Sequence, residues 1–288
     1  MNVMNSINYN WSNSYYIDMP SQYMLRVLFV PLQFKGGKMN YIKIPRALIY
    51  DSTIQNKDLI LVYSYLYIRN GLDNVVLFTI DNMVSWAGYT PDSHKGKVND
   101  RFISYLEYLS NNEYIVASIN YRNYSGNECI QVTVNANHFH LIPDNFAIIH
   151  IDEIHKLMNY KEYLTDYSRI STGKLLSLLS YIRANTNVNP KKPLCCYRMY
   201  KTISTDIGLS IKAIPKLVFA LDELDIIKTH SLKKVKIRKE NGSYIFLTAP
   251  KIFVDCYKYL YDDIFDTTYD YKKEIEKQIR FFENQKEK

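Results

Sequence analysis

The chain has no long apolar run, because its most hydrophobic stretches are short and interrupted. MLRVLFVPLQF contains Arg, Pro and Gln, and DNFAIIHI contains Asp and His. Both fall well short of the roughly 20 apolar residues that a membrane-spanning helix needs. The N-terminus, MNVMNSINYNWSNSYYIDMP, has neither the basic segment nor the apolar segment of a secretory signal. We therefore expect a cytoplasmic protein with no membrane partner.

Several motifs for catalysis and metal binding are also missing. The four cysteines include no CxxC pair, and the adjacent Cys195 and Cys196 cannot close an unstrained disulfide. The sequence lacks the GxxxxGK[ST] phosphate loop, a GxGxxG turn after a strand, HExxH and GxSxG. ATPase, hydride-transfer and hydrolase activities therefore have no support. We expect a protein that is not an enzyme and needs no cofactor or metal.

Positive charge is concentrated in one part of the chain. The formal net charge is +7. Residues 39–137 contain eight basic and nine acidic residues, whereas residues 201–239 contain nine basic and four acidic ones. A clustered basic excess indicates a polyanionic partner, whereas a dispersed one affects only solubility. The second half of the chain is therefore the better candidate for contact with nucleic acid.

The same order of elements occurs twice in the sequence. At 288 residues, 47% of them hydrophobic, the chain is long enough for two globular domains. Each unit has an amphipathic helix, a short helix that stops at Gly88 or Gly208, a third helix, and a hairpin turned at YSGN or ENGS. We expect Thr90 and Pro91 to cap the third helix of the first unit, and Ser210 that of the second. This order predicts a mainly α fold with small β-hairpins (α+β), namely two tandem winged helix-turn-helix domains.

The two units resemble tandem winged-helix replication proteins of plasmids and phages from low-GC Gram-positive bacteria. YIKIPRALIYDSTIQNKDLILVYSYL and WAGYTPDSHKGKVNDRF carry the resemblance in the first unit, and LLSYIR and DIGLSIKAIPKLVFALDELDII carry it in the second. That family contains replication initiators and replisome organisers. The resemblance implies sequence-specific binding to double-stranded DNA at origin repeats, without catalysis. A winged-helix transcriptional regulator that binds an operator is the alternative.

The expected DNA contacts lie on the third helices and on the second wing. In a helix-turn-helix, N-terminal residues of the second helix of the motif enter the major groove, while basic side chains hold phosphates. Pro215 lies about five residues inside the expected helix, so that helix either starts later or kinks. A solvated basic face is the alternative to a DNA contact. The expected contact residues are Ser210, Lys212, Ala213, Lys216, Lys233, Lys234, Lys236, Arg238 and Lys239, with His94, Lys95, Lys97 and Arg101 in the first unit.

Two further partners and one enzyme remain as alternatives. The nearly neutral first unit is as suited to docking a partner or a second copy as to holding DNA. The helix expected in YKKEIEKQIRFFENQ either packs on the second unit or binds a replicative helicase, a loader or another subunit. His138 and His140 in HFHLIP are a weak signal for a metal-dependent rolling-circle nicking enzyme, with Tyr160 or Tyr163 as nucleophile.

The expected domain boundaries follow from these segments. Residues 1–38 form an N-terminal extension, which is either a real strand-bearing segment or untranslated, because FKGGKM is what a ribosome-binding site before Met39 would encode in frame. The first winged-helix domain spans residues 39–137, a linker or strand spans 138–152, the basic second domain spans 153–260, and an amphipathic tail spans 261–288.

Overall fold

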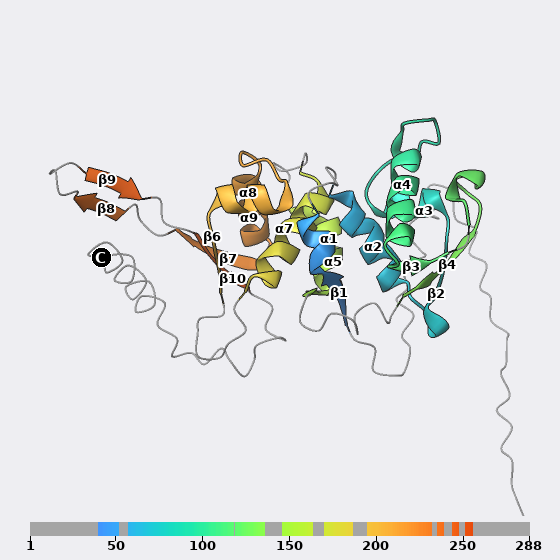
Figure 1. Ribbon diagram of the computed structural model, residues 1–288, viewed down its shortest axis with the longest axis horizontal. Coiled ribbons are helices and arrows are strands. Elements are labelled where there is room, and N and C mark those ends of the chain that lie inside the picture. Colours follow the sequence, from blue (N-terminus) through green and yellow to red (C-terminus); the bar gives the residue numbers. More distant parts are fainter. Residues whose placement is uncertain are drawn as a thin grey trace, which may run out of the picture. The chain divides into compact units, whose positions relative to one another are not determined.

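Helices alternate with short antiparallel strands in the computed structural model (Figure 1). The structure describes residues 40–51, 57–117, 119–135, 146–163, 170–186, 195–231, 235–238, 244–247 and 251–255. Their mixture of helices and small antiparallel sheets confirms the predicted α+β class. Within these ranges, no helix combines the length and the apolar character needed to cross a bilayer.

The first half of the described chain, residues 40–135, begins with a strand and a short helix. A longer helix follows, and then a strand, two helices and two strands, with 3-10 turns at Leu72–Asn74 and Tyr121–Asn123. The elements are β1 (Tyr41–Pro45), α1 (Arg46–Tyr50), α2 (Asp58–Ile68), β2 (Val75–Phe78), α3 (Ile80–Trp86), α4 (Val98–Asn111), β3 (Ile115–Val116) and β4 (Ile130–Val134).

The second half, residues 146–255, repeats this order with two insertions. The insertions are a short helix, α6, and a hairpin, β8–β9. The repeated order of elements that the sequence predicts is therefore present in the structure. The elements are β5 (Phe146–His150), α5 (Ile151–Met158), α6 (Tyr160–Tyr163), α7 (Thr172–Ala184), β6 (Cys195–Arg198), α8 (Tyr200–Ile207), α9 (Ile214–Glu223), β7 (Ile227–Ser231), β8 (Val235–Arg238), β9 (Tyr244–Leu247) and β10 (Lys251–Asp255).

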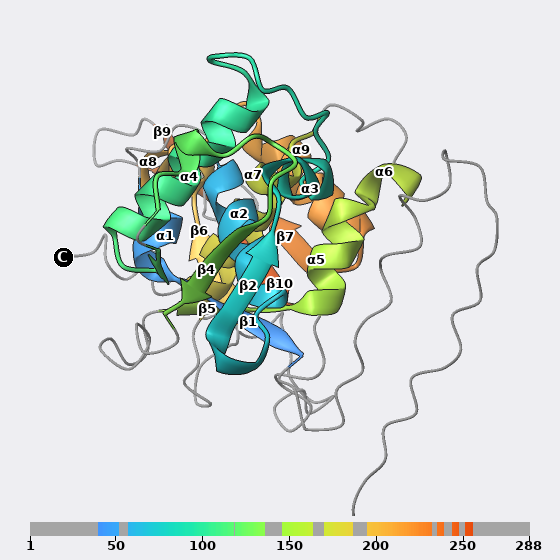
Figure 2. The same ribbon diagram turned by 90° about the vertical axis from the view of Figure 1, so that its right-hand side faces the viewer.

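Each half has a three-stranded antiparallel sheet with the same strand order. In the first half β4 lies between β2 and β3, and in the second half β10 lies between β6 and β7. Figure 2 shows β2 and β4 side by side. In both halves the last strand is central, and its two neighbours come from before and after the pair of helices.

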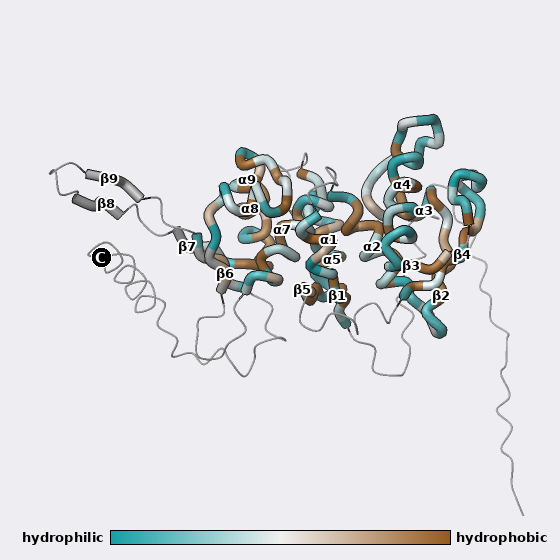
Figure 3. Tube along the Cα trace, in the orientation of Figure 1, coloured by the Kyte–Doolittle hydropathy of each residue, from teal (hydrophilic) through white to brown (hydrophobic). Residues whose placement is uncertain are grey.

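The two halves meet through the β1–β5 strand pair and through packed helices, with α2 against α7 and α1 against α7 and α8. β1 pairs with β5 in an antiparallel register that runs from Tyr41 opposite His150 to Pro45 opposite Phe146. α2 packs against α7 so closely that a Cβ at Gly173 would lie 2.5 Å from Oδ1 of Asp58. Both helices are buried over most of their length, as expected of helices inside a core. Figure 3 shows hydrophobic residues along β4 and β5, which line the same core.

In each half, a glycine with a left-handed backbone conformation follows the second of the three predicted helices, as the sequence predicts. Gly208, at the C-cap of α8, has φ +65°, and Gly88, just after α3, has φ +83°. These backbone angles disfavour every residue with a Cβ. The chain turns at these glycines toward α9 and α4 respectively.

The predicted start of α4 is wrong. α4 begins at Val98, so Thr90 and Pro91 lie in the preceding loop and do not cap the helix. Asn99 holds that loop in a non-helical path. Its side-chain oxygen accepts a hydrogen bond from the backbone N–H of Asp92 (3.0 Å), and its amide donates to Oγ of Ser93 (3.1 Å). These long-range contacts outweigh the local signal of a proline at a helix start.

α9 also begins later than the Ser210 cap predicts. It starts at Ile214, which places Pro215 in its first turn. Backbone N–H groups in the first turn have no acceptor within the helix, so the N–H that proline lacks costs no hydrogen bond. Ser210 instead opens the turn before the helix, where its carbonyl oxygen accepts a hydrogen bond from the N–H of Ala213 (2.8 Å). Of the two outcomes expected for Pro215, a later start and a kink, the later start is correct.

Sequence reasoning missed the first strand of each sheet, β2 and β6. Both have only four residues, and β6 contains the adjacent cysteines. A strand this short has little periodicity of its own. It exists because β4 and β10, far along the chain, supply its hydrogen-bonding partners.

Candidate nucleic-acid interface

Two of the lysines that the sequence assigns to DNA lie at the start of α9, Lys212 in the turn before the helix and Lys216 in its first turn. Ser210, Lys212 and Lys216 are exposed, and Ala213 is half-buried. The opposite side packs into the core through its apolar residues, as predicted. These residues are Ile214, Leu217, Val218, Leu221 and Leu224. The core contacts therefore fix which side of α9 faces solvent.

Lys212 and Lys216 have no carboxylate partner among the residues that the structure describes. Two acidic residues at the C-terminal end of α9 pair with another lysine, Lys228. Its Nζ lies 2.5 Å from Asp225 and 3.3 Å from Asp222. The Asp225 carboxylate raises the pKa of Lys228 above its usual value. Lys228 thus engages Asp222 and Asp225, whereas Lys212 and Lys216 have no ion pair within the described chain.

The hairpin between β7 and β10 is described only in its strands. Lys236 lies opposite Phe246, and Arg238 lies opposite Tyr244, in the β8–β9 register. Lys233, Lys234 and Lys239 lie outside the described residues. The predicted basic wing therefore has its two strands in the structure, and its contacts with DNA remain a prediction.

In the first half, three predicted contacts lie in a loop and not on a helix. His94, Lys95 and Lys97 are all exposed in the segment that precedes α4, and Figure 3 shows this segment as largely hydrophilic. Nδ1 of His94 lies 2.7 Å from the Asp92 carboxylate, and hydrogen bonding to His94 lowers the pKa of Asp92. His94 thus already has an acidic neighbour, whereas the two lysines are exposed.

Arg101 lies apart from those three residues and reaches toward the interior. Its guanidinium is 3.5 Å from the fully buried carboxylate of Asp58 and lies over the ring of Tyr89. The Tyr89 hydroxyl donates a hydrogen bond to Asp58 (2.9 Å). Burial, reinforced by the Asp58 charge, raises the pKa of Tyr89 to about 12. This arrangement gives Arg101 a structural contact in the core.

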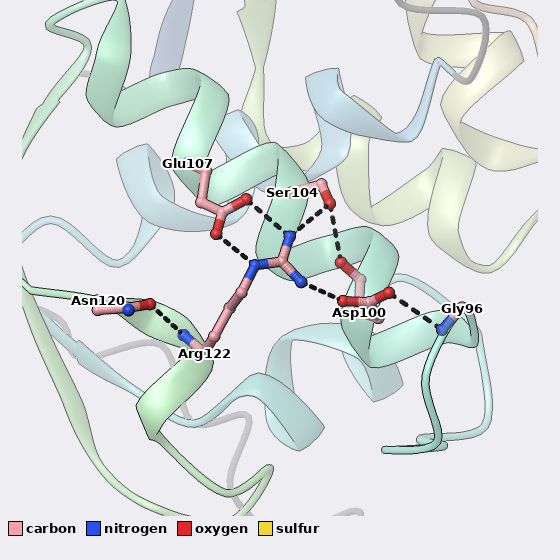
Figure 4. Close-up of polar contacts among 6 residues, drawn as sticks. All are labelled: Gly96, Asp100, Ser104, Glu107, Asn120 and Arg122. Atoms are coloured by element: carbon pink, nitrogen blue, oxygen red, sulfur yellow. Dashed lines mark hydrogen bonds and ion pairs between the residues drawn. The ribbon is translucent and has the colours of Figure 1, made fainter.

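Arg122 forms a clamp with two acidic residues of α4, which the sequence did not predict (Figure 4). Its guanidinium lies 2.5 Å from Asp100 and donates two hydrogen bonds to Glu107, at 2.8 and 2.9 Å. The backbone N–H of Gly96 also donates to Asp100 (3.0 Å). That amide and Arg122 together hold the pKa of Asp100 below its usual range. The charge of Arg122 is therefore neutralised within the chain.

Among the residues of the nicking-enzyme hypothesis, the structure describes the surroundings of Tyr160 only. His138 and His140 lie outside the described residues. Tyr160 is fully buried, and its hydroxyl donates a hydrogen bond to the carbonyl oxygen of Ile170, so it does not face solvent as a nucleophile must. Across the described ranges, no group of three His, Cys, Asp or Glu side chains is placed to hold a metal ion.

Two cysteines have described side chains. Cys196 is buried in β6, and Cys129 is exposed just before β4. The candidate interface therefore contains no cysteine.

Comparison with known proteins does not identify a family for this chain. No family model matches it, and no curated protein is significantly similar to it.

Proposed function

We propose that each half of the chain is a winged helix-turn-helix domain. Support comes from the order of elements, since α2, β2, α3, α4, β3 and β4 correspond one by one to α7, β6, α8, α9, β7 and β10. The shared strand order, with the last strand in the centre, supports the same assignment. In this fold α4 and α9 are the reading helices, and β7, β10 and the inserted β8–β9 hairpin form the wing of the second half.

The second half binds double-stranded DNA through α9 and its wing. The observation that carries this proposal is the pair of exposed lysines, Lys212 and Lys216, which lack a carboxylate partner within the described part of the chain. Lys212 lies in the turn before α9 and Lys216 in the first turn of the helix. This is the end that enters the major groove in helix-turn-helix proteins. The lysines and arginine of the hairpin would add phosphate contacts.

The biological role proposed is initiation of DNA replication for a plasmid, phage or other mobile element. It rests on the resemblance to tandem winged-helix replication proteins and on the uneven charge of the two halves. The basic second half anchors the protein at origin repeats in the cytoplasm without catalysing a reaction. The neutral first half contacts an adjacent site, a second copy, or a replicative helicase or loader.

Fluorescence anisotropy with duplexes from the protein's own locus and unrelated duplexes, over a salt series, tests DNA binding. The wild type is compared with Lys212→Ala/Lys216→Ala. Removing two phosphate contacts reduces the slope of log affinity against log salt by about 2. Lys228→Ala is the matched control, because Asp222 and Asp225 already neutralise that lysine. Equal binding by the double variant and the wild type would refute the role of α9.

A second experiment separates replication from transcription. The bound locus is placed on a plasmid that cannot replicate in a Gram-positive host, and the protein is supplied from the chromosome. Maintenance of the plasmid supports initiation. Repression of a reporter from the same locus without plasmid maintenance supports an operator-binding regulator and overturns the replication role.

A further inference from the structure

Apolar side chains flank the lysines on the solvent side of α9. The described residues include five large exposed hydrophobic side chains, and two of them, Ile211 and Phe219, lie in this segment with exposed fractions of 47% and 45%. Pro215, in the first turn of the helix, is exposed as well. The face proposed to meet DNA is therefore part cationic and part apolar, unlike a purely phosphate-binding face.

The same segment lacks the side chains that read purines by paired hydrogen bonds. Residues 208–223, GLSIKAIPKLVFALDE, contain no Arg, Asn, Gln or His. Arg reads guanine bidentately, and Asn or Gln reads adenine bidentately. The remaining polar donors are one serine and two lysines. Apolar side chains in the major groove contact one feature of a base edge, the 5-methyl group of thymine.

The position of Ile211 fits a direct contact with a base. Ile211 lies in the turn that leads into α9, and the N–H of Ile214 bonds to the carbonyl oxygen of Ser210 (3.3 Å) across that turn. Ile211 and Pro215 therefore both lie at the N-terminal end of the helix, where base contacts are made in helix-turn-helix proteins. Phe219 lies one turn further along, toward the C-terminal end.

We infer that the second half recognises thymine-containing sites by contact of Ile211 and Pro215 with thymine 5-methyl groups, while Lys212 and Lys216 hold phosphates or a guanine edge. This inference rests on the DNA binding proposed above. It names the chemistry of the bases read and not only the presence of duplex DNA. In the first half, Asn99 and Arg101 of α4 are of the types that read purines, but both contact other residues of the chain.

Replacing thymine by deoxyuridine tests the inference, since the two bases differ only in the methyl group. Duplexes that bind the full-length chain are selected from a random-sequence pool, and the preferred duplex is remade with deoxyuridine at every thymine. We expect affinity to fall about fourfold for each methyl group contacted. In Ile211→Ala and in Pro215→Ala, we expect the ratio of the affinity for the thymine duplex to that for the deoxyuridine duplex to move closer to one. Leu77→Ala, which truncates a 60% exposed residue of β2, leaves the ratio unchanged.

The outcomes separate this inference from the proposed function. Selective binding with equal affinity for the thymine and deoxyuridine duplexes overturns methyl recognition and leaves DNA binding intact. The same thymine preference in Ile211→Ala/Pro215→Ala as in the wild type assigns it to other residues and overturns the inference. Failure to select any duplex above the unselected pool overturns both proposals. Circular dichroism of each variant confirms that the fold is kept.

Discussion

The two halves share an order of elements but treat surface charge in opposite ways. In the first half, the outer side of α4 carries Asp100 and Glu107, and both are paired with Arg122. In the second half, the turn before α9 carries Lys212 and the helix carries Lys216, and neither lysine has an acidic partner among the described residues. One fold can thus present a neutral face or a cationic face, and the difference lies in a few side chains.

Both halves also hold charged side chains that are buried and paired within the chain. The first half buries a carboxylate, Asp58, beside Tyr89 and Arg101. The second half buries a guanidinium, Arg183, which is 4% exposed and pairs with Glu153 and Asp255. This triad joins α5, α7 and β10. It keeps two acidic residues of the second half buried and paired with a cation.

The largest effect is expected from breaking the buried triad. Arg183→Ala leaves Glu153 and Asp255 buried without their cation, and removing one partner of such a group costs about 3–5 kcal/mol of unfolding free energy. Urea unfolding followed by circular dichroism measures the loss. Lys201→Ala, an exposed lysine of α8, is the control and should change stability by less than about 0.5 kcal/mol. A loss below about 1 kcal/mol for Arg183→Ala would contradict a structural role for the triad.

The close packing of α2 on α7 predicts the next largest effect. In an exposed helix Gly→Ala usually stabilises a protein, because the unfolded chain loses freedom. At Gly173 the new methyl group would lie 2.5 Å from Oδ1 of Asp58 and 3.0 Å from its backbone N. We therefore expect destabilisation by about 1–3 kcal/mol in the same assay. Lys174→Ala, at the exposed neighbouring position, is the control, and stabilisation by Gly173→Ala would refute tight contact between the halves.

Local signals in the sequence identified most helices and the repeat. Apolar periodicity marked α7, and the core side of α9 from Ile214 to Leu224 is correct. Glycine marked the ends of α3 and α8, because a positive φ is a local property of the backbone. What could not be read locally depended on distant partners. β2 needs β4, and the loop before α4 needs Asn99.

The candidate site was predictable to the extent that it is charged and helical. Lys212 and Lys216 have the exposure expected from their spacing. Arg101 shows the limit of this reasoning, because its partner Asp58 lies 43 positions earlier in the chain, on α2. The Arg122 clamp joins residues on α4 and in the segment after β3, and nothing in their spacing signals a contact. Charge counts gave a nearly neutral first unit, but not the pairing that neutralises its wing.

Removing the acidic residues that pair with Arg122 should give the first half an unpaired surface cation, as in the second half, and raise its affinity for DNA. Asp100→Asn/Glu107→Gln frees Arg122 and deletes two negative charges from the outer side of α4. We expect the affinity for unrelated duplex DNA at low salt to rise on the order of threefold. The rise is small because interactions of exposed charges are weak and are screened by salt. Anisotropy measures this rise, which should disappear as salt is added. The control is Asp73→Asn/Glu113→Gln, two exposed acidic residues, and an equal rise in the control would show that net charge alone matters.

The smallest effect concerns the exposed pair of the second half, Lys228 with Asp225. Hydrogen bonding and the charge of Lys228 lower the pKa of Asp225 in the folded protein. The folded state therefore binds this proton less readily than the unfolded chain. The stabilisation is complete above the ordinary aspartate pKa and is lost as the pH falls through the lowered value. Asp225→Asn should flatten the loss of stability below about pH 4 and leave stability at pH 7 nearly unchanged, since exposed pairs contribute little.

Asn is the appropriate replacement for Asp225 because of the backbone at this position. Asp225 has φ +51°, a conformation that Asn tolerates and most other residues do not. The substitution thus removes the charge without straining the turn after α9. Urea unfolding at a series of pH values compares it with Glu223→Gln, at an exposed acidic residue that has no ion pair within the described chain. If both variants change the loss of stability at low pH equally, the pairing of Asp225 with Lys228 does not contribute to stability.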